Sequence, residues 1–397
     1  MIITQKISRV ASIDVFRAIT MLLMIFVNDL WTLRDIPSWL EHVSAAEDGL
    51  GLADVVFPAF LFIVGLSIPL AVQYRFSKGD SDATIIKHTL WRGLALIIMG
   101  VFHVNLESYS DSAILPKELW EIIITVSFFF IWLDYPKDMA EKKKYFLKGL
   151  GVVLLVVMAS LYKGGSANQP QWMTTQWWGI LGLIGWSYLI GSLIYIFFRN
   201  NILVQIAFFV FFISFSAAAH LQALAWLSFI RPYVWLISEG ALPAIVMAGI
   251  IVTGLYLRTR EESNYPRFFI LMTASSVLLI LFCVVTRPWW GIHKISASPS
   301  WVALCIAISI LFFIILIRWV DIKQKDGWFS FLKPAGTSTL TCYLLPYLHY
   351  SIISWIGISL PMFLRTGMIG ILKSILYALA IVALTGILEK KKIKLKL

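Results

Sequence analysis

The sequence predicts an all-α integral membrane protein, a polytopic bundle of about ten to twelve transmembrane helices. Hydrophobic residues make up 59% of the 397 residues and charged residues only 14%, which excludes a single soluble domain with a polar surface. The chain has 17 tryptophans and 14 tyrosines, and such amphipathic rings concentrate where membrane meets water. The net charge of +11 would suggest nucleic acid in a soluble protein, but here we expect no nucleic-acid partner, because the charge is distributed between loops.

Apolar runs of spanning length follow one another along the whole chain. They cover about 13–31, 52–73, 85–104, 118–133, 146–162, 177–198, 202–220, 240–257, 268–286, 301–319, 337–356 and 364–388. Two of these runs are short, so a count of ten or eleven helices would also fit. We see no soluble domain and no convincing repeat of helices, and we therefore interpret 1–397 as one transmembrane domain.

The basic residues predict how the chain is oriented. If the N-terminus is cytoplasmic, most of the 33 Lys and Arg residues fall in cytoplasmic loops or in the C-terminal tail, as the positive-inside rule requires. Both termini are then cytoplasmic and residues 32–51 lie outside. The first run follows Lys6 and Arg9 but contains Asp14 and Arg17 and is followed by no small-residue cleavage site, so we interpret it as a retained helix and not a signal peptide.

Ionisable groups inside the spans are expensive, so each is a functional candidate with an expected partner. Asp14 and Arg17 are three residues apart on one helical face, where they could form an ion pair that orients the first helix. Arg92 follows His88 by four residues in the third run. These two side chains either reach the inner interface with their polar ends or form part of an inner site for an anion.

Three polar residues around the first long connection could act together. Asn28 supplies an amide donor, His42 a base of the type that titrates near neutral pH, and Asp54 a carboxylate able to orient that base. Such a set suits acyl transfer. Each also has an ordinary explanation, since His42 could be a simple loop histidine and Asp54 a first-turn carboxylate favoured by the helix dipole.

Four further residues are candidates for substrate contacts: Asp29, Glu239, His293 and Lys294. Glu239 stands at the entrance of the helix predicted from "EGALPAIVMAGIIVTG" (239–254), whose glycines predict close helix packing. His293 and Lys294 lie in "GIHKISASPSWV" (291–302), on the same predicted side as His42. They would line a shared vestibule or lie in an exposed loop.

The cysteines point to no metal site. Cys283, Cys305 and Cys342 all fall inside apolar runs. They show no CxxC spacing and no disulfide framework, so we interpret them as small apolar residues.

Two sequence blocks resemble the transmembrane acyltransferase family typified by heparan-alpha-glucosaminide N-acetyltransferase. The first is "RVASIDVFRAITMLLMIFVN" (9–28) and the second is "EHVSAAEDGLGLADVVFPAFLFIVGLSIPL" (41–70). Weaker matches follow in order at Arg92, Gly100, 239–243, 293–302 and 334–345. The family often has Trp-Asn-Gly shortly after its histidine, where this chain has "AEDG" at 46–49.

The resemblance implies an enzyme in the inner membrane of a bacterium. It would move an acetyl group from cytoplasmic acetyl-CoA to an amino sugar of the terminal glucosamine type, or to a glycan hydroxyl, on the far side of the bilayer. The family's active-site asparagine matches Asn28, its active-site histidine matches His42, and the aspartate before Phe-Pro matches Asp54.

The resemblance also implies where the acetyl donor would bind. The phosphates of acetyl-CoA would meet basic residues at the inner mouth of the bundle, since guanidinium and ammonium groups bind phosphate well. Our candidate set is Arg92, Lys87 and Arg75.

Two other functional classes fit parts of the sequence. A secondary transporter could use Asp14, Arg17, Asp29 and Asp54 as coupling residues, but such proteins usually show paired repeats and broken helices, which we do not find. A non-catalytic membrane scaffold would explain the hydrophobicity but not the polar set around His42. Exposed aromatic helices are compatible with a homodimer in either case.

Overall fold

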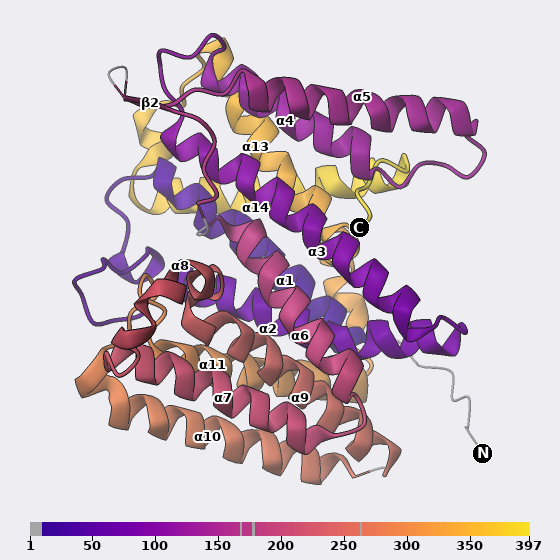
Figure 1. The fold of residues 1–397 in the computed structure, drawn as a ribbon, viewed down its shortest axis with the longest axis vertical. Helices are drawn as coiled ribbons and strands as arrows, with labels where there is room; N and C mark the ends of the chain where they lie inside the picture. Colours follow the sequence, from indigo (N-terminus) through magenta and orange to yellow (C-terminus); the bar gives the residue numbers. More distant parts are fainter. Residues whose placement is uncertain (1–9, 167–168, 177–178, 263) are drawn as a thin grey trace. The chain divides into compact units, whose positions relative to one another are not determined.

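The computed structural model describes residues 10–166, 169–176, 179–262 and 264–397. Most of these residues are helical. Lys6 and Arg9 lie outside the described residues. The helices, shown in Figure 1, are α1 (Ala11–Asp29), α2 (Leu52–Ser77), α3 (Asp82–Val104), α4 (Lys117–Trp132), α5 (Glu141–Ser160), α6 (Ile180–Phe198), α7 (Ile202–His220), α8 (Arg231–Val234), α9 (Ala241–Glu261), α10 (Tyr265–Trp290), α11 (Pro299–Leu316), α12 (Lys333–Thr337), α13 (Thr339–Ile356) and α14 (Gly367–Lys390). One short antiparallel pair joins β1 (Gly164–Ser166) to β2 (Gln169–Gln171).

Each of the twelve apolar runs contains a helix, so the predicted all-α membrane fold is confirmed. Residues 177–178 of the run 177–198 lie outside the described residues. Within the described residues, nine helices are long and apolar enough to cross a bilayer. The three other runs form α4, α5 and α13. α4 has only 16 residues, and α5 begins with the charged segment "EKKK", which explains why these two fall short of a complete apolar span.

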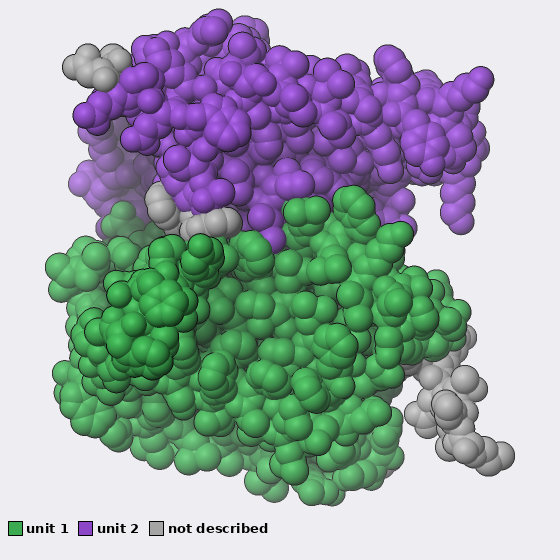
Figure 2. All heavy atoms as spheres, viewed as in Figure 1, with its two compact units in different colours: residues 1–20, 37–94, 183–330 green, residues 21–36, 95–182, 331–397 purple. Residues whose placement is uncertain are grey.

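The chain forms two compact units, and each is assembled from separate stretches of sequence (Figure 2). Unit 1 contains residues up to 20 together with 37–94 and 183–330, and unit 2 contains 21–36, 95–182 and 331–397. α1 therefore begins in unit 1 and ends in unit 2. That the whole of 1–397 acts as one catalytic domain stays a prediction.

The loops of unit 1 meet in two separate groups. In one group the backbone N–H of Gly49 donates to the carbonyl oxygen of Ile292 at 3.2 Å. In the other, Arg199 Nη1 lies 3.1 Å from Asp82 Oδ1. The first group joins loops that the basic residues predict to lie outside, and the second joins loops predicted to lie inside. The predicted sidedness of these loops stays a prediction.

The ion pair predicted inside α1 is present. Arg17 Nη1 lies 3.1 Å from Asp14 Oδ1, and Arg17 Nη2 donates to Ser67 Oγ at 2.6 Å. Because Ser67 belongs to α2, the guanidinium group ties the first half of α1 to α2 as well as neutralising the carboxylate on its own helix.

α2 and α9 approach closely at two glycines. A Cβ added to Gly65 would lie 2.1 Å from the carbonyl oxygen of Val246, and one added to Gly249 would lie 2.2 Å from the carbonyl oxygen of Phe62. Backbone atoms cannot withdraw as a flexible side chain could, so only glycine fits at either position. The close packing predicted for the start of α9 is confirmed at Gly249. At Gly254 the nearest atom would be 3.8 Å away, from Ile202.

Gly249→Ala is expected to destabilise the protein by roughly 1–3 kcal/mol through overpacking. Gly254→Ala adds the same methyl group to the same helix where there is room, so it should be neutral or slightly stabilising, since alanine favours a helix over glycine. The midpoint of thermal unfolding of both detergent-solubilised variants measures this. Equal midpoints would contradict the close approach of α2 and α9.

Candidate active site

The carboxylate of Asp54 forms the centre of a polar cluster in unit 1. Asp54 lies in the first turn of α2, and its side chain is only 1% exposed. Its Oδ1 lies 2.7 Å from Nδ1 of His42, a side chain that is 51% exposed. Its Oδ2 accepts from the backbone N–H of Val43 at 3.1 Å and of Gly51 at 3.0 Å. One buried carboxylate therefore begins α2, closes the loop before it and holds the histidine.

The loop can close on Asp54 only because residue 51 is glycine. A Cβ on Gly51 would lie 1.9 Å from the carbonyl oxygen of Glu41, which no other residue type could tolerate. α11 contacts the same turn, since Trp301 Nε1 donates to the backbone oxygen of Asp54 at 3.3 Å. Both the dipole role and the histidine-orienting role considered for Asp54 are compatible with this geometry.

A second carboxylate joins this loop to the segment after α10. Asp48 Oδ1 accepts from the backbone N–H of Ile292 at 2.7 Å, and Asp48 Oδ2 accepts from Arg287 Nε at 2.8 Å. The Ile292 hydrogen bond and then the Arg287 guanidinium hold the pKa of Asp48 below its ordinary value. We call the contacts of Asp48 with Ile292 and Arg287 the loop clasp. The sequence analysis missed it, because its partners are about 240 positions apart and only their opposite charges hint at a pairing.

The segment held by the loop clasp brings Lys294 against the histidine. Lys294 Nζ lies 3.0 Å from Nδ1 and 3.2 Å from Nε2 of His42, and 3.9 Å from Asp54 Oδ1. Burial lowers the pKa of Lys294, an effect that the nearby Asp54 carboxylate opposes. Lys294 was predicted to line the same vestibule as His42, and the structure brings the two together.

The tight turn around Lys294 is fixed by its own hydrogen bonds. Ser298 Oγ donates to the carbonyl oxygen of Gly291 at 2.9 Å and accepts from the backbone N–H of His293 at 3.1 Å. The His293 ring packs against Gly291, which has a φ of 61°. Nδ1 of His293 is buried and has no hydrogen-bond partner among the described residues, so its predicted contact with a substrate stays a prediction.

This cluster contains the parts that general base catalysis requires. A carboxylate can only accept a hydrogen bond, so the short contact to Asp54 fixes the hydrogen on Nδ1 of His42. Nε2 then carries the lone pair, on a side chain that is half exposed and can meet a substrate. A base of defined tautomer, oriented by a buried carboxylate, is the arrangement that activates nucleophiles in acyl transfer.

Asn28 and Asp29, the two polar residues at the end of α1, belong to unit 2. Asn28 is exposed. Asp29 has a side chain only 2% exposed, lies 2.6 Å from Lys373 Nζ and accepts a hydrogen bond from the hydroxyl of Tyr350. Asp29 therefore has internal partners that satisfy its charge, and a contact between Asp29 and a substrate stays a prediction, as does the catalytic role of Asn28.

Glu239 also has an internal partner. Its Oε1 lies 3.0 Å from Arg231 Nε, and it occupies a turn in which Ser238 and Glu239 have φ values of 48° and 55°. Gly240 follows with a φ of 96°, and α9 begins at Ala241. The predicted helix entrance is confirmed, whereas the predicted substrate contact is not tested by this geometry.

The three residues predicted to bind cofactor phosphates all lie in unit 1. Arg75 Nη1 lies 3.0 Å from Asp80 Oδ2, the Arg92 guanidinium lies 5.2 Å from the centre of the Tyr188 ring, and Lys87 is exposed. Their proposed ligand contacts stay predictions.

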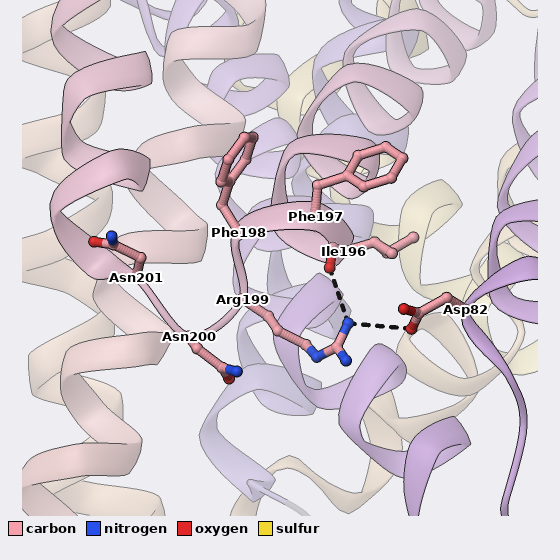
Figure 3. Close-up of a pocket in the computed structure, with 7 residues that line it drawn as sticks. All are labelled: Asp82, Ile196, Phe197, Phe198, Arg199, Asn200 and Asn201. Atoms are coloured by element: carbon pink, nitrogen blue, oxygen red, sulfur yellow. Dashed lines mark hydrogen bonds and ion pairs between the residues drawn. The ribbon is translucent and has the colours of Figure 1, made fainter.

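A small pocket of about 300 Å³ lies between the start of α3 and the junction of α6 with α7 (Figure 3). Its lining residues are Asp82, Ile196, Phe197, Phe198, Arg199, Asn200 and Asn201. Arg199 Nη1 lies 3.1 Å from Asp82 Oδ1, and the guanidinium lies 4.1 Å from the centre of the Phe76 ring. The sequence analysis did not single out Arg199, because a basic residue in a short loop between two spans is what the positive-inside rule predicts anywhere.

Comparisons with known proteins match the region that contains this cluster. Residues 9–109 match the family model described as heparan-alpha-glucosaminide N-acetyltransferase, catalytic. The predicted resemblance to this family is confirmed. Heparan-alpha-glucosaminide N-acetyltransferase of Mus musculus is 29% identical over 183 residues, which are 42% of this chain and 24% of the relative. That of Homo sapiens is 37% identical over 101 residues, 24% of this chain and 14% of the relative. The chain thus matches a quarter or less of these relatives' length.

Asp54→Asn is expected to destabilise the protein by roughly 2–3 kcal/mol, because an uncharged amide cannot accept from His42 and two backbone N–H groups as a carboxylate does. Asp48→Asn is the matched control, since its partly exposed ion pair should contribute about 1 kcal/mol or less. Thermal unfolding of both variants tests the difference. An Asp54→Asn variant as stable as Asp48→Asn would show that Asp54 does not organise the loop.

The contribution of Asp48 to stability should depend on pH. Its pKa is lower in the folded state than the ordinary value of 3.8, so the stabilisation is fully present above 3.8 and is lost as the pH falls through the lowered pKa. The difference in unfolding midpoint between the wild type and Asp48→Asn should accordingly be constant from neutral pH down to 3.8 and shrink below it. A difference that grows on acidification would contradict the loop clasp.

Proposed function

We propose that this chain is a membrane acetyltransferase that moves an acetyl group from acetyl-CoA to the amino group of a glucosamine-type sugar. The observation that carries the proposal is the pair formed by the half-exposed His42 and the buried Asp54, 2.7 Å apart. Both residues fall inside the segment 9–109 that matches the catalytic family model. The names of the matched relatives supply the acetyl group and the glucosaminide acceptor.

In the proposed reaction, His42 moves one proton from the acceptor to the leaving group. Nε2 takes a proton from the sugar amine as the nitrogen attacks the thioester carbonyl carbon. The C–N bond forms, the C–S bond breaks, and the departing thiolate takes the proton from Nε2. Asp54 stabilises the imidazolium that exists between these two proton transfers, and it keeps the ring oriented throughout.

The developing oxyanion needs a hydrogen-bond donor. Asn28 stands where the family pattern has its active-site asparagine, and its amide could donate to that oxygen, a contact of a type that contributes about 3 kcal/mol in other acyl-transfer enzymes. Asn28 is exposed at the end of α1, so its amide is not buried by other residues of unit 2.

Both termini are proposed to be cytoplasmic, in the inner membrane of a bacterium, and His42 on the opposite side. The donor then enters from the cytoplasm, and its phosphates meet Arg75, Lys87 and Arg92. Arg199, beside the pocket of Figure 3, extends this basic set, because it is one-third exposed and its planar guanidinium suits phosphate. A homodimer is also part of the proposal.

The transporter alternative is less favoured. All four of its proposed coupling residues have close internal partners: Asp14 and Arg17 pair with each other, Asp29 with Lys373, and Asp54 with His42. The matched relatives are named as acetyltransferases.

The test is acetyl transfer from labelled acetyl-CoA to glucosamine by the purified, detergent-solubilised protein. His42→Ala should lower the rate by about 100-fold or more, since a positioned base contributes that much, while calorimetry should show CoA binding unchanged. Glu47→Ala is the control, because Glu47 is an exposed residue of the same loop and has no part in the proposed chemistry.

Full activity in His42→Ala would remove the histidine from the mechanism. Absence of both transfer and CoA binding in the wild type would overturn the proposed function and return the transporter to consideration.

A further inference from the structure

Lys294 is placed over the face of the His42 imidazole. Its Nζ lies 3.0 Å from one ring nitrogen and 3.2 Å from the other. An atom at nearly equal and short distances from both nitrogens cannot lie in the plane of the ring, because it would overlap the carbon between them. The ammonium group therefore does not use the lone pair on Nε2, which stays open to a substrate, and its charge acts on the ring through space.

We propose that Lys294 is a positioning residue whose charge, held over the ring, opposes protonation of His42. Only the catalytic consequence of this inference rests on the proposed function, because Lys294 acts on the protonation of His42 whether or not a reaction takes place. An ammonium group over the ring repels a positive charge on that ring. Lys294 thus offsets the opposite effect of Asp54, which alone would favour the imidazolium.

The charges that face His42 come from two elements. Asp54 of α2 contributes one negative charge at 2.7 Å, and Lys294 of the 291–298 turn contributes one positive charge. Within 37–51 and 287–298, the other charged groups are Asp48 and Arg287, which pair with each other at 2.8 Å, and the exposed Glu41 and Glu47, whose effects water screens. With His42 neutral the cluster of three is balanced, and protonation of His42 would leave it with an unbalanced positive charge.

Lys294 cannot easily leave this position. Its carbonyl oxygen accepts from the backbone N–H of Ala297 at 2.9 Å, which is part of the tight turn that the loop clasp fixes through Ile292. Its side chain is 27% exposed and lies 3.9 Å from Asp54 Oδ1. The ammonium group is therefore anchored by the carboxylate while it lies over the ring.

The chemical consequence concerns both halves of the reaction. A neutral His42 is ready to take a proton from the acceptor amine at once. The imidazolium that then forms is destabilised by Lys294, so it gives its proton more readily to the departing thiolate. Lys294 would lower the barrier of the second proton transfer while Asp54 supports the first.

The experiment measures the charge state of His42 directly. Diethyl pyrocarbonate acylates only uncharged imidazole, and mass spectrometry of the His42 peptide gives the labelling rate as a function of pH. Lys294→Met removes the positive charge, so the pH at which labelling is half-maximal should rise by about one unit or more. Lys294→Arg keeps the charge and should stay near the wild-type value. His88, an exposed histidine of α3, serves as the reference whose profile should not move.

An unchanged or lower midpoint for His42 in Lys294→Met would overturn the proposal. If Lys294→Met does not fold, Arg287→Gln provides the second variant, because it weakens the loop clasp without touching the ring. Its labelling midpoint for His42 should lie above that of the wild type, and an unchanged midpoint would overturn the proposal. The labelling needs no acetyl-CoA, so the two proposals can fail separately. A shifted labelling midpoint in a protein that transfers no acetyl group would support the proposed effect of Lys294 on His42 and would reject the proposed function.

Discussion

A negative charge buried at the start of a membrane helix must find partners, and this requirement organises the whole polar cluster of unit 1. Asp54, with a side chain 1% exposed, accepts from His42 and from two backbone N–H groups of the loop before it. Replacing water around a carboxylate is expensive unless its hydrogen-bonding capacity is filled. The loop conformation, the orientation of the histidine and the beginning of α2 are therefore three results of one interaction.

A second set of charged residues, Asp48, Arg287 and Lys294, adds contacts to those of Asp54 without replacing any of them. The loop clasp of Asp48 keeps the 287–298 segment beside the histidine loop, and this segment brings Lys294 to the imidazole. Asp48 belongs to the "AEDG" segment in which the chain departs from the pattern usual in the family. In this chain the departure supplies a contact between two loops.

The sequence could predict what is local or what depends on a membrane's thickness. All twelve apolar runs became helices because only a helix satisfies its own backbone in lipid, and Asp14 met Arg17 because three residues make nearly one helical turn. Residue chemistry and the family resemblance both singled out Asn28, His42 and Asp54, and the structure brings His42 and Asp54 together. The predicted sidedness placed Lys294 beside His42 only as far as a shared vestibule, and its contact with the ring, about 250 positions away in the sequence, was not predicted. The pair Asp48–Arg287 spans about 240 positions, and no periodicity encodes a contact between loops at such separations. Such contacts depend on tertiary packing alone, as do the ion pairs of Asp29 with Lys373 and of Glu239 with Arg231.

The exposure of His42, in contrast to the burial of Asp54, has a consequence for where a proton is released. An amine that arrives protonated must lose two protons in the proposed reaction, and only one of them can go to the departing thiolate. The imidazole of His42 is 51% exposed, so it can pass the first proton to water before it takes the second from the neutral amine. If His42 lies on the acceptor's side of the membrane, as proposed, this first proton need not cross the bilayer, and the membrane potential does no work on it. Release of that proton would then be insensitive to membrane voltage.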